Sequence, residues 1–157
     1  MAEPAGKRVA DSYLEQVYIV EAQHLNRIQT FFGGQLLSWM DVIAGEVATR
    51  HSDGSSTMVA VDEMQVTTPA HLGDKLVYTG KLTNVGRTSM EIFVEVFIED
   101  AEKNRKSISE AYIMTVALDD GGRPRPVPPL IVETEEEKAL WEAAEQRKAR
   151  RNSRRGK

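Results

Sequence analysis

Residues 34–50 (GQLLSWMDVIAGEVATR) constrain the fold more than any other segment of the chain. Apolar residues recur there at helical spacing, namely Leu36, Leu37, Met40, Ile43, Ala44, Val47 and Ala48. Trp39 and Val42 widen this apolar stripe beyond one face of the helix. Because so wide a stripe must be buried on most of its sides, we predict a central helix that the rest of the chain wraps.

Five segments rich in β-branched and aromatic residues predict strands, at about 12–21, 57–66, 74–84, 88–99 and 108–118. In segment 88–99, apolar residues such as Met90 and Ile92 alternate with Glu91 and Glu95, which is typical of a half-buried strand. The connections between the last four segments permit hairpins but not the crossover helices of a parallel sheet. We therefore predict an α+β fold in which a four-strand antiparallel meander follows the central helix.

A chain of 157 residues has the size of one globular domain. Residues 1–11 mix Pro, Gly and charge without a period, and we expect a mobile N-terminus there. Residues 12–131 form the predicted domain, which ends in a proline-rich extended connection. Residues 132–157 predict a final helix with a basic tail, and Thr134 with Glu137 gives that helix a capping box at its start.

The composition excludes several kinds of site. The chain has no Cys, and its three histidines (His24, His51 and His71) lack metal-ligand spacing, so we predict no metal site. The absence of a phosphate loop and of GxGxxG argues against nucleoside triphosphates and dinucleotides. No apolar run approaches the roughly 18–20 residues that span a bilayer, and the first residues are too polar for a secretory signal. We therefore expect a cytoplasmic protein with no membrane partner.

Charge is unevenly distributed along the chain. The net charge is −4, but residues 146–157 contain seven Lys or Arg and no acid, which leaves 13 basic and 24 acidic residues in 1–145. An acidic body repels nucleic acid over most of its surface, so we do not expect a nucleic-acid-binding protein. The simplest interpretation of the basic tail is a solvated helix end.

The candidate site lies at the start of the central helix. Gly33 and Gly34 come without a Ser, Thr or Asp cap, which leaves backbone N–H donors for an anion or a developing oxyanion, although a glycine pair also marks tight turns. Asp41 interrupts the apolar face, where a carboxylate either has a function or faces solvent or a salt bridge within a dimer. Arg87, in the turn VGRTS, either meets a phosphate or faces solvent.

Five segments then occur in a familiar order: FFGGQLLSWMD, VAVDEMQVTTPAHLGD, VGRTSMEIFVEV, DDGGRPRPVPP and TEEEKALWE. From about residue 12 to about residue 151, the chain resembles the hotdog-fold acyl-CoA thioesterases of the acyl-CoA hydrolase branch, above all the small single-domain bacterial enzymes. The resemblance implies a hotdog fold, an antiparallel sheet wrapped around one central helix, plus a C-terminal helix. It also implies hydrolysis of acyl-CoA to free acid and coenzyme A, with no cofactor other than the coenzyme A of the substrate.

The resemblance implies roles for individual residues. Asp41 falls on the family's catalytic aspartate, and Asn26 on an asparagine that lies across a dimer interface from it. Gly34 would offer its backbone N–H to the thioester oxygen. The residues implied to bind the substrate are Gly33, Arg87, Thr88 and Ser89.

The loop before the helix departs from the family pattern, because His24 replaces an acid and Gln29 replaces a glycine. If Gln29 does not take up left-handed backbone, the loop must follow another route, which would change substrate range or turnover. This departure keeps an alternative open, a non-catalytic acyl-CoA sensor whose basic tail contacts a partner. A third option, a hotdog-fold dehydratase, requires a histidine at the site, for which His24 is the one candidate.

The expected partners are the acyl-CoA substrate and further copies of the chain. A dimer is the minimal unit, because the site and the apolar helix both need a second subunit. By analogy with the family, the full assembly is a trimer of dimers, which is a hexamer.

Overall fold

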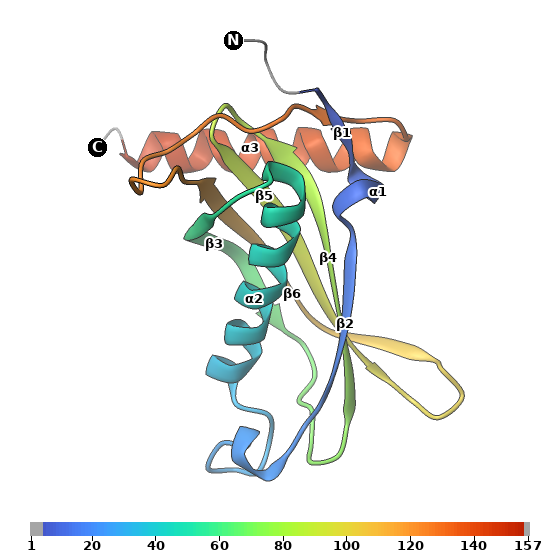
Figure 1. The fold of residues 1–157 in the computed structure, drawn as a ribbon. Helices are drawn as coiled ribbons and strands as arrows, with labels where there is room; N and C mark the ends of the chain where they lie inside the picture. Colours follow the sequence, from blue (N-terminus) through green and yellow to red (C-terminus); the bar gives the residue numbers. More distant parts are fainter. Residues whose placement is uncertain (1–4, 156–157) are drawn as a thin grey trace.

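A computed structural model describes residues 5–155, and its centre is the long helix α2 (Figure 1). The elements are β1 (Lys7–Arg8), α1 (Val9–Ser12), β2 (Leu14–Ile19), η1 (Ala22–His24), α2 (Gly33–Ser52), β3 (Ser56–Val66), β4 (Lys75–Val85), β5 (Ser89–Glu99), β6 (Arg105–Ala117), β7 (Leu130–Ile131) and α3 (Glu135–Arg155). Leu36, Met40, Ile43, Ala44, Val47 and Ala48 of α2 are buried, which confirms the predicted central helix.

The five-stranded antiparallel sheet has the order β2-β4-β5-β6-β3. β4, β5 and β6 form hairpins, as predicted. The four-strand meander is wrong for β3, which pairs with β6 instead of β4. The segment 67–74, with its Pro and Gly, carries the chain across the molecule, and β2 takes the place beside β4. The sheet therefore has two open edges, β2 and β3.

The helix and the sheet meet most closely at Gly80 of β4. A Cβ atom on Gly80 would lie 2.7 Å from Cγ2 of Ile43 and 3.0 Å from Cγ2 of Val47, both on α2. Only a residue without a side chain allows the helix to approach the strand at this distance. This contact seats α2 on the middle of the sheet, with Met40 and Ala44 fully buried beside it.

The helix α3 covers the opposite face of the sheet at one end of the molecule (Figure 1). Its predicted capping box is confirmed, because the backbone N–H of Glu137 donates to Oγ1 of Thr134 at 3.0 Å and Oε1 of Glu137 accepts from the backbone N–H of Thr134 at 3.5 Å. Glu91 of β5 lies on the face that the sequence assigned to the polar side of a half-buried strand. It is 1% exposed instead, because α3 covers it and Arg147 pairs with it.

The N-terminal segment is built into the fold from residue 7 onward, where the sequence predicted no regular structure; residues 1–4 lie outside the described part. β1 pairs in parallel with β7 of the proline-rich segment. Nζ of Lys7 lies 2.8 Å from Asp53 and donates to the carbonyl of Arg50 at 3.2 Å. A cation is favourable at the carbonyl end of a helix, so Lys7 stabilises the last turn of α2. Through β1 and β7, the N-terminal segment and the proline-rich segment also lie side by side. Within residues 5–155, no helix has the length and apolar composition needed to cross a membrane.

His51, in the last turn of α2, fastens the proline-rich segment to the helix. The side chain is fully buried, and its Nε2 lies 2.7 Å from the carbonyl oxygen of Pro128. Because that oxygen can only accept, Nε2 carries the proton, and Nδ1 has no hydrogen-bond partner among the described residues. Burial lowers the pKa of His51, so the folded chain keeps this side chain neutral.

We expect His51 to make stability depend on pH in mild acid. The unfolded chain protonates this histidine at its usual pKa of about 6.5, whereas the folded chain does so only at a lower pH. The free energy of unfolding should therefore be constant above about pH 6.5 and fall below it by up to about 1.4 kcal/mol per pH unit. Urea denaturation of wild type and His51→Gln between pH 5 and 8 checks this. Equal slopes for the two proteins would contradict it.

Candidate functional site

Asp41 lies in the middle of α2 and is half-buried. Its neighbours Met40 and Ile43 point into the core, whereas Val42 is 58% exposed. Within residues 5–155, the carboxylate of Asp41 has no hydrogen-bond donor and no cation at ion-pair distance. A salt bridge inside the chain therefore does not account for this residue, and its carboxylate is free to act on a ligand or a second chain.

The helix α2 begins without a side-chain cap. The N-cap residue is Phe32, and the ladder starts with the backbone N–H of Leu36, which donates to the carbonyl of Phe32 at 3.0 Å. The backbone N–H groups of Gly33 and Gly34 have no acceptor among the described residues, and both glycines are exposed. A Cβ atom on Gly34 would lie 2.5 Å from Cε1 of Phe32, whereas a Cβ atom on Gly33 would contact nothing within 4 Å. The predicted free donors are therefore present at the start of the helix.

Asn26 organises the loop that leads into α2. Its Oδ1 accepts from the backbone N–H groups of Ile28 and Thr30, both at 3.0 Å, and its Nδ2 donates to Oγ1 of Thr30 at 2.8 Å. Gln29 adopts a left-handed backbone with φ of 65°. The glutamine therefore takes up the conformation that a glycine favours, and the loop keeps its turn at a cost of about 1–2 kcal/mol.

His24 is engaged in the same loop. Its Nδ1 accepts from the backbone N–H of Glu21 at 3.0 Å, so a neutral His24 carries its proton on Nε2. The imidazole ring packs edge-on against Trp39 with 4.8 Å between ring centres, and Trp39 in turn stacks on Tyr18 at 4.1 Å. No carboxylate in the described chain bonds to His24, and its contacts are those of a residue that holds the loop against α2.

Tyr78 lies beneath the helix, next to this aromatic group. Its hydroxyl donates to the carbonyl of Leu36 at 3.1 Å. Burial raises the pKa of Tyr78, so the hydroxyl stays protonated and remains a donor. The first turns of α2 are thereby fixed by the hydrogen bond from Tyr78 and by the packing of Trp39, on α2, against Tyr18 and His24.

The turn between β4 and β5 holds the other predicted binding residues. Gly86 donates its backbone N–H to the carbonyl of Ser89 at 2.9 Å, which closes the turn around Arg87 and Thr88. The Arg87 side chain is exposed, and no carboxylate of residues 5–155 lies at ion-pair distance from it. The adjacent cavity has a volume of about 330 Å³ and is lined by Val85, Gly86, Arg87, Pro126, Val127, Pro129, Leu130 and Trp141.

Lys148 of α3 also lies beside this turn, which the sequence did not predict. Its Nζ lies 3.1 Å from the position that a Cβ atom on Gly86 would take. The only signal in the sequence was the basic end of the last helix, which does not indicate where that helix packs.

One chain does not bring all the predicted site residues together. Asp41 follows Gly34 by seven residues, which places it about 10 Å further along the helix axis. The loop of Asn26 lies beside the segment that leads into β4, where the backbone N–H of Phe31 donates to the carbonyl of Ala70, and Arg87 follows the end of β4. Eleven residues of strand separate these two ends by about 35 Å. A single small ligand group cannot contact Asp41, Gly34 and Arg87 of the same chain.

Comparison with known proteins gives a consistent result. The sequence profile of the thioesterase superfamily matches residues 28–104. The chain is 36% identical over 130 residues to a Bacillus subtilis protein named uncharacterized acyl-CoA thioester hydrolase YkhA, which covers 82% of this chain and 76% of that protein. The structure of this chain is similar to that of an apo-hexameric acyl-CoA thioesterase, with a TM-score of 0.90 and 34% identity. The match covers 96% of this chain and 97% of that one.

A second solved relative is an acyl-CoA hydrolase from Staphylococcus aureus in complex with butyryl coenzyme A, coenzyme A and coenzyme A disulfide. It has a TM-score of 0.88 and 32% identity, and the match covers 95% of this chain and 92% of that one. Further structures of the Staphylococcus aureus protein carry an asparagine, an aspartate or a threonine replaced by alanine.

We expect Asn26→Ala to destabilise the loop before α2, because two backbone N–H groups lose their acceptor. The free energy of unfolding should fall by about 1–3 kcal/mol. Asn26→Asp keeps a carboxylate oxygen for both N–H groups, and its second oxygen can accept from the Thr30 hydroxyl, so its loss should be smaller. Urea denaturation combined with amide exchange at Ile28 and Thr30 checks both variants. Unchanged protection of these two amides in Asn26→Ala would show that the side chain does not hold the loop.

Proposed function

The chain belongs to the thioesterase superfamily, among its hotdog-fold acyl-CoA thioester hydrolases, and we propose that it hydrolyses acyl-CoA to a free acid and coenzyme A. The observation that carries this proposal is Asp41, a half-buried carboxylate without an internal partner, on a helix whose first N–H groups are free. A base and a set of oxyanion donors are the two groups that thioester hydrolysis needs.

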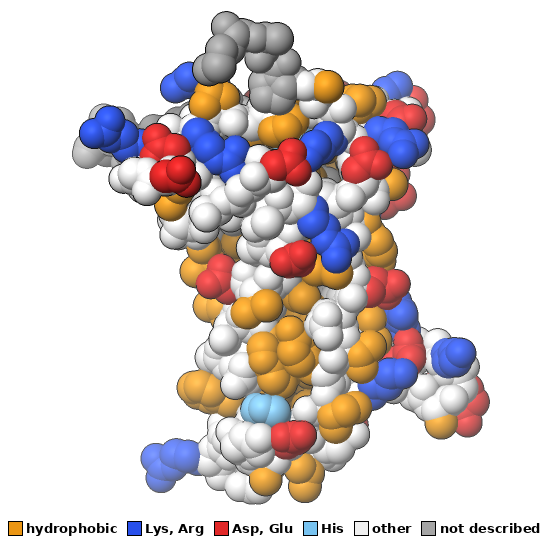
Figure 2. All heavy atoms as spheres, in the orientation of Figure 1, with side chains coloured by type: hydrophobic (Ala, Val, Ile, Leu, Met, Phe, Trp, Pro, Cys, Tyr) orange, Lys and Arg blue, Asp and Glu red, His pale blue; other side chains and the backbone are white. Residues whose placement is uncertain are grey.

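We propose that two subunits build each site. Asp41 and the Gly34 N–H of one chain are about 10 Å apart along α2, whereas base and oxyanion donor must both lie about 3 Å from the reacting groups. A second α2 running in the opposite direction would place its Gly34 beside the first Asp41. The open edge of β3 and the exposed side chains of Val42, Met58 and Val59 provide the surface for this pairing. Figure 2 shows hydrophobic side chains gathered over the half of the molecule where α2 begins.

The proposed reaction uses these groups in one sequence. The Asp41 carboxylate takes a proton from a water molecule, and the resulting hydroxide adds to the thioester carbonyl carbon. The carbonyl oxygen becomes an oxyanion and accepts the backbone N–H of Gly34 from the other subunit, next to Gly33. The C–S bond then breaks, and the proton held by Asp41 passes to the thiolate of coenzyme A. Direct attack of the carboxylate on the carbonyl is the alternative first step.

A thioester carbonyl is electrophilic enough for this set of groups, and the proposed chemistry uses no metal or other cofactor. In this proposal, Asn26 shapes the loop beside the water through its bonds to Thr30 and Ile28 instead of contacting the substrate through Oδ1. The asparagine and aspartate variants of the Staphylococcus aureus relative support the choice of these two residue types.

We propose that Arg87, Thr88 and Ser89 bind the coenzyme A part of the substrate. Arg87 has no internal carboxylate partner, and its guanidinium suits a phosphate. Because Arg87 lies about 35 Å from the loop of Asn26 in its own chain, it would serve a site whose Gly34 belongs to another subunit. Hexameric relatives support a trimer of dimers as the full assembly, and the cytoplasmic location stays a prediction.

The alternative of a non-catalytic sensor loses part of its support. It relied on a basic tail that is free to contact a partner. In the structure, Arg147, Arg150 and Arg151 of that tail pair with carboxylates of the sheet. Three of the seven basic residues that the sequence assigned to a solvated helix end are therefore paired within the chain.

We expect Asp41→Asn to reduce kcat by about 100-fold to 10,000-fold, because an amide cannot accept a proton from water. The matched control is Glu46→Gln, which removes a carboxylate from the same helix at an exposed position paired only with Arg50. Thiol release from acyl-CoAs of short to long chain length measures both variants and gives the chain-length preference of the wild type. Undiminished hydrolysis by Asp41→Asn would overturn the mechanism.

Gly34→Ala should lower kcat/KM by about 10-fold or more, because a displaced oxyanion donor costs up to several hundred-fold. The added methyl group would meet the Phe32 ring at 2.5 Å, so the N-cap residue of α2 must move. Gly33→Ala is the matched control, because its Cβ atom meets nothing within 4 Å in the chain. The same thiol assay compares the two. Equal effects of both substitutions would remove the argument for Gly34.

A further inference from the structure

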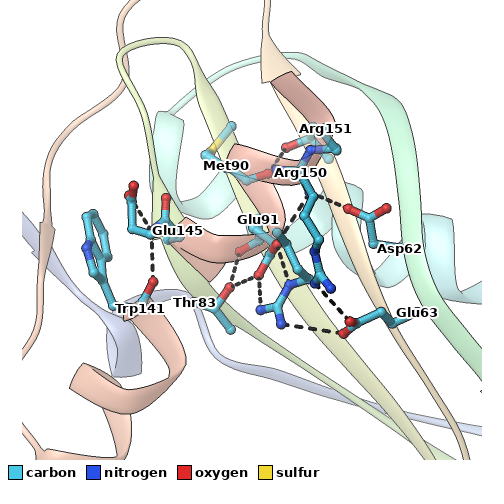
Figure 3. Close-up of polar contacts among 12 residues, drawn as sticks. Asp62, Glu63, Thr83, Met90, Glu91, Trp141, Glu145, Arg150 and Arg151 are labelled. Atoms are coloured by element: carbon cyan, nitrogen blue, oxygen red, sulfur yellow. Dashed lines mark hydrogen bonds and ion pairs between the residues drawn. The ribbon is translucent and has the colours of Figure 1, made fainter. Parts of the chain in front are cut away.

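Three arginines on one face of α3 hold a group of carboxylates on the sheet (Figure 3). Arg147 donates from Nε and Nη2 to the two carboxylate oxygens of Glu91, at 3.1 and 2.8 Å. Oγ1 of Thr83 donates to the same carboxylate at 2.6 Å, and the guanidinium of Arg147 lies 3.5 Å from the ring centre of Tyr112. Glu91 and Arg147 are 1% and 5% exposed, so this pair is the buried anchor of α3.

From this anchor the contacts continue to β3, the edge strand. Nη1 of Arg147 and Nη2 of Arg150 lie 3.5 and 3.1 Å from the carboxylate oxygens of Glu63. Arg151 pairs with Asp62. We call Arg147, Arg150 and Arg151 the arginine cluster. Figure 3 shows Arg150 and Arg151 turned toward Asp62 and Glu63 from α3.

The arginine cluster contacts β3 where its pairing with β6 shifts register. Asp62 pairs with Tyr112 and Gln65 with Glu110, so two residues of β3 lie opposite one residue of β6. This is a β-bulge, and Glu63 within it has a left-handed backbone with φ of 52°. A glutamate in that conformation costs about 1–2 kcal/mol, and the surrounding contacts must hold it there. The two arginines on its carboxylate are the side-chain contacts of Glu63 in the structure.

The bulge lies on the edge where the proposed second subunit pairs. β3 has no strand on its outer side within residues 5–155, and Met58 and Val59 on it are exposed. A bulge turns an edge strand away and weakens its pairing with another chain. The bulge at Glu63 therefore marks the end of the stretch of β3 that is available for pairing, and a smaller register shift lies within that stretch, between Met58 and Ala60.

We infer that the arginine cluster of α3 fixes the pairing edge of β3 and thereby controls the association of two copies of this chain. The inference rests on the proposed two-subunit site. In this arrangement α3, on the face of the sheet opposite α2, helps to build a site at α2. The partner is a second copy of the chain, because the exposed edge of β3 consists of unpaired strand backbone beside apolar side chains.

The double variant Arg150→Ala/Arg151→Ala tests this, because it frees Asp62, leaves Glu63 with Arg147 alone, and keeps the Arg147–Glu91 pair in place. The matched control, Arg154→Ala/Arg155→Ala, removes the same charge from the next turn of α3, where no ion pair is found within the described chain. Sedimentation velocity over a range of concentrations measures the dissociation constant of the assembly. We expect the test variant to raise it by about 10-fold or more and the control by less than about 3-fold.

Two further measurements separate association from general instability. In the test variant, thiol release per chain should fall on dilution and recover at high protein concentration, which a merely destabilised subunit would not show. Glu63→Asn added to the test variant should recover most of the lost association, because asparagine tolerates the left-handed backbone without help. Where the double variant does not fold, the single variant Arg150→Ala, which keeps the Arg151–Asp62 pair, is measured in the same way.

Dissociation constants that agree between test variant and control, or an activity loss that does not depend on concentration, would overturn the inference. That outcome is distinct from failure of the proposed function. If the wild type releases no thiol from any acyl-CoA, the proposed hydrolysis is wrong, whereas sedimentation still decides whether the cluster controls association.

Discussion

The contact between α2 and Gly80 of β4 is the constraint on which the rest of the structure depends. An apolar helix of 20 residues has to be covered, and the sheet covers it by letting Ile43 and Val47 rest directly on the strand backbone. This contact decides which side of α2 is buried, and so leaves Asp41 and Val42 on the uncovered side. The side of the helix that the sheet does not cover therefore carries both the unpaired carboxylate of Asp41 and the exposed apolar side chain of Val42, which are the features that a two-subunit site requires.

On the opposite face of the sheet, a buried ion pair adds to the apolar contacts that Trp141 and Ala144 of α3 make. Burying Glu91 and Arg147 costs desolvation energy, which is offset only by good geometry and by satisfying the remaining hydrogen-bonding groups. The bidentate hydrogen bonds between Arg147 and Glu91 meet that requirement, together with the Thr83 hydroxyl and the Tyr112 ring. Removing one partner of such a pair typically costs about 3–5 kcal/mol, so the pair fixes one docking position for α3.

The sequence predicts well what local pattern determines. The apolar stripe gives α2 to within two residues, period-two segments give the strands, and Thr134 with Glu137 marks the start of α3. Pairing order is not local. The composition of the segment 67–74 fits a hairpin turn as well as a crossing connection, so local pattern predicts β3 beside β4, whereas β3 pairs with β6. The candidate site follows the same rule. Asp41 and Gly34 are visible as exceptions to a pattern, whereas the role of Asn26 depends on hydrogen bonds within a turn that no periodicity reports.

The spacing of Gly34 and Asp41 along one rigid helix has a consequence for how the sequence can change. In the proposed pair, each α2 contributes its first turn to one site and its middle to the other. A substitution that tilts or shortens α2 therefore perturbs both sites at once, one through the donor and the other through the base. A substitution in such a helix is therefore kept only if both catalytic centres tolerate it, the one that uses the first turn and the one that uses the middle of the helix.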